Sequence, residues 1–210
     1  MNDASPRLVL VTPRRFDPET FAPLFAEALE SADIAAAILD IEDEDASAWM
    51  AATAALLPVA HEAGVPLLLK GRTDLVLATG ADGAHVIGEA ATIKAAQKEL
   101  KPELIVGAGD CTIRHTAMII GETQPDYIFL GRLDDEDLTA TASLVEWWVE
   151  LFEVPCVAMA SEDWSDVDRL GRANADFIAL RDLVWNDARG PGKALEKARA
   201  LLPGQRASAA

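Results

Sequence analysis

Basic residues are scarce in this chain of 210 residues, in which 18 Lys and Arg stand against 35 Asp and Glu, for a formal net charge of −17. Such a charge repels phosphate backbones and anionic lipid, so nucleic acids and membrane surfaces are excluded as partners. Only two cysteines occur, Cys111 and Cys156, without a CxxC pattern or a nearby histidine pattern. Their number and spacing argue against a disulfide framework and against a zinc site.

Long apolar runs are also missing. No run approaches the roughly 20 residues of a membrane-spanning helix, and the N-terminus lacks the apolar core and cleavage site of a signal peptide. We therefore expect a cytoplasmic protein.

Half of the residues are apolar, which is enough for a core, and the length suits one domain. Short runs rich in Val, Ile and Leu alternate with longer segments of helical period, a pattern typical of βα units around a parallel sheet. The expected strands are 8–12, 34–39, 66–69, 84–87, 104–107, 127–130, 156–160 and 177–180.

A repeat accompanies these runs. An aspartate preceded by Ala or Pro stands just before every second expected strand, at Asp33, Asp82, Asp126 and Asp176, with spacings of 49, 44 and 50 residues. Four copies of a two-unit repeat predict a compact (βα)8 TIM barrel as a single domain over 8–202. An open, doubly wound sheet is the alternative. The ends, 1–7 and 203–210, are expected to be loose.

The segment GVPLLLKGRTDLVLATGADGAHVIGEA at 64–90 resembles the third-strand to fourth-strand region of the thiamine-phosphate synthase and thiazole tautomerase family. The resemblance continues more weakly through 104–112, 125–131, 154–160 and 175–180, and spans the chain from Leu8 to about Val184. It implies a barrel whose loops after the strands join a pyrimidine pyrophosphate to a thiazole phosphate with the help of magnesium. An active member would be a transferase of the thiamine-phosphate pyrophosphorylase type.

The match is incomplete at the positions that bind phosphate and metal. Arg72 matches a family arginine, and Lys70, Gly109 and Ser161 stand at or beside other phosphate-binding positions. The two magnesium-binding aspartates of the family align with Gly71 and Ala90, neither of which can ligate a metal, so magnesium is doubtful. Glu89, Asp110 and Asp40 are the remaining metal candidates. His85 is more typical of an interior histidine, and Cys111 is a reactive thiol only if it is exposed beside a cation.

Acidic residues occupy loops where the family has neutral, glycine or basic groups. The carboxylates that could face the mouth are Asp40, Glu42, Asp110, Asp134, Asp135, Glu162 and Asp182. We therefore expect a synthase-like barrel with weak, altered or no synthase activity. Two alternatives stay open: an enzyme of different chemistry whose acidic mouth holds a divalent cation or cationic ligand, and a non-catalytic binding or assembly protein.

The ligand expected from the sequence is small, and either phosphorylated or cationic. The adjacent Trp147 and Trp148 point about 100° apart on their helix, so both are unexpected in one core. We take them as candidates for the interface of a homodimer.

Overall fold

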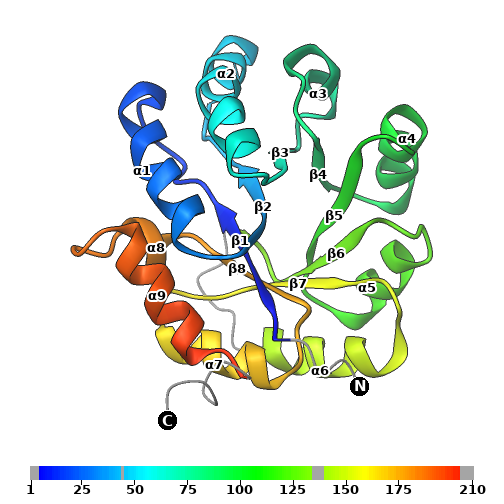
Figure 1. Ribbon diagram of the computed structural model, residues 1–210. Helices are drawn as coiled ribbons and strands as arrows, with labels where there is room; N and C mark the ends of the chain where they lie inside the picture. The colour runs from blue at the N-terminus through cyan, green and yellow to red at the C-terminus, as the bar shows by residue number, and fades with distance from the viewer. Residues whose placement is uncertain (1–4, 44, 134–139, 204–210) are drawn as a thin grey trace.

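The computed structural model describes residues 5–43, 45–133 and 140–203. Eight parallel strands form a closed barrel in chain order, and β8 pairs with β1 to complete it (Figure 1). The predicted single-domain TIM barrel is confirmed, and the open sheet is wrong. The strands are β1 (Arg7–Val11), β2 (Ile34–Leu39), β3 (Leu67–Lys70), β4 (Gly83–Ile87), β5 (Ile105–Cys111), β6 (Tyr127–Leu130), β7 (Cys156–Met159) and β8 (Phe177–Leu180).

Helices surround this barrel (Figure 1). They are α1 (Pro18–Ser31), α2 (Ala46–Glu62), α3 (Thr73–Thr79), α4 (Ala90–Leu100), α5 (Arg114–Gly121), α6 (Thr141–Leu151), α7 (Trp164–Arg172), α8 (Asp182–Trp185) and α9 (Pro191–Leu201). No helix in the described part of the chain is both long enough and apolar enough to span a membrane.

Each predicted strand overlaps an observed one. The largest difference is β5, which continues to Cys111 rather than ending at 107, because its pairing with β6 shifts register between Ala108 and Cys111. Strand β1 begins at Arg7, one residue earlier than predicted. Residues 1–4 and 204–210 lie outside the described part, so the loose ends stay a prediction there.

Side chains alternate between two apolar layers, as the two-residue period of a strand requires. Leu8 and Leu10 of β1 belong to the large cluster that packs against the helices, whereas Val9 and Val11 face the barrel interior. The interior cluster is completed by Ile38, Leu68, Tyr127, Phe129, Leu133, Val157, Met159 and Ala179. Inward positions at the carboxyl ends of the strands therefore form the floor of the barrel mouth.

The aspartate repeat joins neighbouring strands. In three of its four copies a carboxylate oxygen accepts a hydrogen bond from a backbone N–H in the preceding strand, which ties the start of one strand to the next. The pairs are Asp82 with Leu67 at 2.8 Å, Asp126 with Val106 at 2.7 Å and Asp176 with Cys156 at 2.9 Å.

The fourth copy uses a side chain in place of the backbone. Asp33 accepts hydrogen bonds from Nε and Nη2 of Arg7, at 3.0 and 2.8 Å, in an exposed ion pair. Arg7 also donates its backbone N–H to the carbonyl of Asp176, at 3.2 Å. The repeat thus extends across the junction of β8, β1 and β2, where the barrel closes.

Part of the loop acidity caps helices. Asp17, Asp45 and Asp163 stand at the N-caps of α1, α2 and α7, and each accepts a hydrogen bond from a backbone N–H in the first turn. These hydrogen bonds lower the pKa of each carboxyl group. Two of the three lie in loops that the sequence marks as acidic, so these acids have a structural role.

Candidate functional site at the barrel mouth

A buried ion cluster lies on the floor of the mouth. Lys70 ends β3, while Asp40 and Arg181 directly follow β2 and β8, all in phase with the inward-facing positions. The Asp40 Oδ2 atom lies 3.0 Å from Lys70 Nζ and is also hydrogen-bonded by Arg181 Nη2. The side chains of Asp40, Lys70 and Arg181 are only 4%, 12% and 5% exposed. One carboxylate oxygen thus joins two cations from opposite sides of β1.

Backbone contacts fix this cluster in place. Thr12 Oγ1 accepts the Asp40 N–H at 3.0 Å and donates to the Asp40 carbonyl at 3.1 Å. Arg181 Nη1 donates to the carbonyl of Leu133 at 3.0 Å. The acid and the arginine are therefore held by segments that follow β1 and β6.

A second polar pair is completely buried in the barrel. His85 Nδ1 lies 2.8 Å from the hydroxyl of Tyr127, and the imidazole is fully buried, as expected for an interior histidine. Burial, with the nearby charge of Lys70, lowers the pKa of His85 to about 3, so the ring is neutral. His85 Nε2 has no hydrogen-bond partner in the described part of the chain.

The glycines of β5 make room for this pair. A Cβ atom on Gly107 would lie 1.9 Å from the Tyr127 ring, and one on Gly109 would lie 2.2 Å from His85 Nε2. Both clashes are far inside van der Waals contact. The Gly-Ala-Gly sequence is thus required by packing inside the barrel. Phosphate binding by Gly109 stays a prediction.

The β3–α3 loop carries Arg72, another predicted phosphate ligand. Arg72 forms a bidentate ion pair with Asp74, with Nε–Oδ1 and Nη2–Oδ2 distances of 3.0 and 2.9 Å, and this contact lowers the pKa of Asp74. The Arg72 guanidinium also lies over the ring of Trp49, 5.8 Å from its centroid. Gly71 has a φ of +67°, and a Cβ there would meet no atom within 4 Å. The space beside the Gly71 Cα is therefore open, while its N–H donates to the His85 carbonyl at 2.9 Å.

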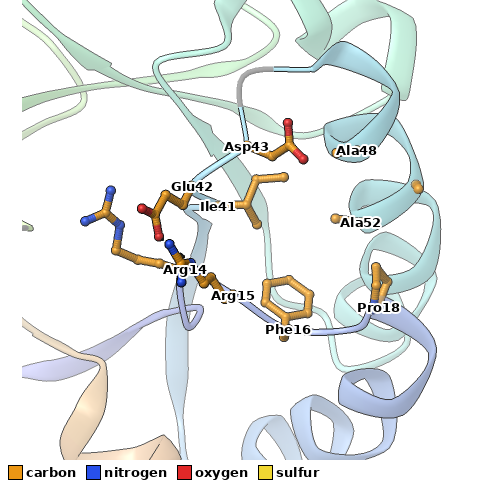
Figure 2. Close-up of a pocket in the computed structure, with 10 residues that line it drawn as sticks. Arg14, Arg15, Phe16, Pro18, Ile41, Glu42, Asp43, Ala48 and Ala52 are labelled. Carbon is orange, nitrogen blue, oxygen red and sulfur yellow. Dashed lines mark hydrogen bonds and ion pairs between the residues drawn. The ribbon is translucent and has the colours of Figure 1, made fainter.

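A cavity of about 330 Å³ lies at the mouth. Lys70, Gly71 and Arg72 form one wall, and Asp40, Arg14 and Trp49 contribute to the others. A second cavity of about 570 Å³ adjoins it, between the segment after β1, the segment after β2 and helix α2 (Figure 2). Four residues line both cavities, namely Arg14, Ile41, Glu42 and Asp43.

The predicted metal ligands do not gather at one place. Glu89 is exposed at the N-cap of α4, and Asp110 is half-buried at the end of β5 with a φ of +63°. Within residues 5–43, 45–133 and 140–203, no three or more His, Cys, Asp or Glu side chains are arranged to hold a metal ion. Asp40 is already bonded to Lys70 and Arg181. Asp134 and Asp135 lie outside the described residues, and the doubt about magnesium stays a prediction.

Ser161 and Cys111 contribute to structure. The Ser161 N–H donates to Asp166 at 3.2 Å, and its hydroxyl accepts the Asp163 N–H at 3.1 Å, so both groups order the turn before α7. Cys111 is buried, and burial raises the pKa of its thiol to about 12. Its thiol is therefore unreactive in the folded chain.

The two adjacent tryptophans differ in burial. Trp148 is fully buried and donates its Nε1–H to the Val154 carbonyl at 2.8 Å, so it is inaccessible to a second subunit. Trp147 is only half-buried, and the Arg114 guanidinium lies 5.1 Å from its ring centroid. Of these two tryptophans, only Trp147 remains a candidate for an interface.

Sequence reasoning missed Arg181, Thr12 and Arg14. Arg181 directly follows a predicted strand and is in phase with its inward residues, a signal that predicts a cation on the floor of the mouth. The hydroxyl contact of Thr12 leaves no comparable pattern in the sequence.

The chain matches the family model for thiamine monophosphate synthase over residues 8–184. It is 34% identical over 203 residues to thiamine-phosphate synthase of Rhodospirillum centenum, covering 94% of this chain and 98% of that protein. The enzyme of the same name from Hyphomonas neptunium is 33% identical, with 93% of each chain covered. The solved thiamine phosphate pyrophosphorylase of Pyrococcus furiosus matches with a TM-score of 0.77 at 25% identity, covering 93% of this chain and 94% of that one. The chain belongs to the thiamine monophosphate synthase family.

Proposed function

We propose that this family member binds a small phosphorylated molecule at the barrel mouth and has weak or no thiamine-phosphate synthase activity. The observation that carries the proposal is the position of Asp40, whose carboxylate joins Lys70 and Arg181 on the floor of the mouth.

The synthase reaction expels pyrophosphate, and its rate depends on groups that stabilise the developing negative charge. At this mouth the Asp40 carboxylate lies between two buried cations, Lys70 and Arg181. Gly71 and Ala90 align with the family's magnesium ligands and offer no side-chain oxygen. Both features oppose a pyrophosphate leaving group more strongly than they oppose a single phosphate bound at the edge of the cavity.

Retained binding rests on the wall made by Lys70, Gly71 and Arg72. Its cavity of about 330 Å³ is near the lower end of the usual range of about 300–1,000 Å³ for small-molecule sites. The planar Arg72 guanidinium, held by Asp74, is suited to phosphate oxygens. The Gly71 N–H donates to the His85 carbonyl at 2.9 Å, so the support comes from the two side-chain cations.

A cationic ligand is less well supported. Asp40 is paired with Lys70 and Arg181, and Glu42 is paired with Arg15 at 2.7 Å. These mouth carboxylates would have to give up their present partners before binding a divalent ion. We therefore favour the phosphorylated ligand over the cationic one.

Pyrophosphate release tests the catalytic half of the proposal. The purified chain is assayed with hydroxymethylpyrimidine pyrophosphate, thiazole phosphate and magnesium, beside the Pyrococcus furiosus enzyme as the positive control. We expect a rate at least about 100-fold lower, which corresponds to about 2.7 kcal/mol in the barrier. A rate equal to that of the control refutes the proposal.

Thermal unfolding with inorganic phosphate tests the binding half, since a ligand that binds the folded state raises the midpoint. Asp40→Asn keeps the shape of the acid and removes its charge, so we expect phosphate to bind about tenfold more tightly, or about 1.4 kcal/mol. The matched control is Glu42→Gln, an exposed acid that lines the same cavity, with little change expected. Phosphate that leaves the midpoint of every variant unchanged contradicts binding.

We also propose that the chain forms a homodimer through α5 and α6. Four large apolar side chains on or beside these helices are exposed. Their burial between two copies would oppose the electrostatic repulsion expected between two acidic chains. They are Ile113 (58% exposed), Met118 (44%), Ile119 (42%) and Leu151 (63%).

Charge on this face is self-complementary. Arg114 is exposed at the start of α5, and Glu146 and Glu150 are exposed on α6. A two-fold axis between the helices would place Arg114 of one copy opposite the acids of the other. A second copy is therefore the partner that this face fits.

A further inference from the structure

A third cavity lies at the end of the barrel opposite the mouth. It occupies about 260 Å³ and is lined by residues at or near the amino ends of seven of the eight strands. Among the described residues, none lines both this cavity and a cavity of the mouth. The two ends of the barrel therefore offer separate spaces.

The lining of this third cavity is mainly apolar. Nine of its twelve residues are Ala, Val, Leu, Ile, Pro or Phe, and the other three are Arg7, Asp126 and Tyr127. The strands contribute the apolar residues Val9, Ala36, Leu68, Ile105, Val157 and Phe177. Ala36, Ile105 and Phe177 are only half-buried, so this end of the barrel keeps apolar surface accessible.

Small residues leave the space. Ala36 is in phase with the inward-facing Ile38, and a shift of register between β1 and β2 adds Ala35 to the lining. In β4 the corresponding inward position, two residues before His85, is Gly83, which has no side chain. A larger residue at position 36 would therefore fill the cavity.

The two charged residues of the lining already have partners. Arg7 forms its bidentate ion pair with Asp33. Asp126 accepts the Val106 N–H at 2.7 Å and pairs with Lys101. A charged ligand would have to compete with these contacts and give up its hydration against apolar walls, which is unfavourable. The cavity therefore favours an uncharged ligand.

Aromatic surface is available on two sides of the cavity, from Tyr127 and Phe177. The Tyr127 hydroxyl lies 2.8 Å from His85 Nδ1, so its hydrogen bond is made inside the barrel and its ring is the part that a ligand meets. Aromatic rings attract one another in offset-stacked and edge-to-face arrangements, beyond the effect of burial alone. The lining therefore favours an aromatic ligand over an aliphatic one.

We propose that this cavity is a second ligand site, which binds an uncharged aromatic molecule of one or two rings. A cavity of about 150 Å³ holds benzene, so about 260 Å³ admits one substituted ring or two fused rings. The site is separate from the phosphate site proposed for the mouth, so neither proposal depends on the other.

The test titrates toluene and benzoate into the full chain, because these two probes differ only in a methyl group against a carboxylate. Tyr127 is the only tyrosine of the chain, so tyrosine labelled with ¹³C in its ring reports on this cavity in NMR spectra. We expect toluene to shift the Tyr127 signals saturably, with a dissociation constant of about 1 mM or tighter. Benzoate should bind at least about tenfold more weakly.

Variants at position 36 locate the bound ring. Ala36→Leu fills the cavity, and Ala36→Val fills it in part with a side chain that suits a strand. Ala95→Leu, at an exposed position on α4, is the matched control. We expect toluene to bind at least about tenfold more weakly to Ala36→Leu, with a smaller loss for Ala36→Val and no change for Ala95→Leu.

Tyr127 signals that toluene leaves unmoved overturn this inference, and so does benzoate that binds as tightly as toluene. A toluene affinity that survives in both variants at position 36 also overturns it, because the ring then lies elsewhere. None of these outcomes bears on the mouth, where inorganic phosphate provides the separate test.

Discussion

Replacing Asp176 tests whether the aspartate repeat stabilises the barrel through buried backbone contacts. The half-buried Asp176 carboxylate accepts the N–H of Cys156, a fully buried residue, at 2.9 Å. Asp176→Ala leaves that N–H without its acceptor, and loss of a hydrogen bond to a charged group costs about 1.5–3 kcal/mol. In a domain of this size each kcal/mol lowers the melting midpoint by about 2–4 °C. We expect a fall of about 3–12 °C by calorimetry.

The repeat supplies its own control. Asp33 occupies the equivalent position, but it pairs with Arg7 at the surface, where the two side chains are 74% and 48% exposed. An exposed ion pair contributes about 0–1 kcal/mol, so Asp33→Ala should shift the midpoint much less than Asp176→Ala does. Asp176→Asn keeps an acceptor oxygen and should recover part of the loss. Equal shifts for Asp33→Ala and Asp176→Ala would refute the assignment of stability to the backbone contact.

Three further predictions concern the barrel interior and the outer face. His85 is neutral in the folded chain, where burial lowers its pKa to about 3 from an ordinary value of about 6.5, so the unfolded chain takes up this proton first as the pH falls. The free energy of unfolding should therefore drop by about 1.4 kcal/mol per pH unit between pH 6 and 4, and denaturant titrations of His85→Gln should lack this part of the slope. Gly107→Ala pushes a methyl group into Tyr127 and should destabilise the fold by about 1–3 kcal/mol, so an unchanged urea midpoint argues against the packing described. Sedimentation should show a dimer that Leu151→Glu dissociates, whereas Leu77→Glu, at another exposed position, leaves it intact; a monomeric wild type rules the dimer out.

The barrel was predictable because its signals are local and repeated. Apolar runs with a strand period and an aspartate before every second run depend only on residues close in sequence. The end of β5 was not predictable, because its register shift and the left-handed backbone of Asp110 arise from packing against β6. A register shift or a single left-handed residue does not change the pattern of apolar residues from which a strand is predicted.

The mouth was predictable only in part. Asp40 and Lys70 were expected there, but as a metal ligand and a phosphate contact. Arg181, the second cation bonded to Asp40, lies 141 residues from it in the sequence, and no local pattern connects the two. The partners of the loop acids were not predictable for a related reason: Asp45 and Asp163 cap helices, and Glu42 pairs with Arg15, which lies 27 residues away in the sequence.

The position of Asp40 between Lys70 and Arg181 bears on how the chain completes its fold. Lys70 is near in sequence and can reach the acid once the first three strands have formed, whereas Arg181 arrives only with the last strand. The contact between Asp40 and Arg181 therefore joins the residues that follow β2 and β8, the two strands that pair with β1 where the barrel closes. A chain shortened before Arg181 would lose one of the two cations of the mouth together with the strand that closes the barrel.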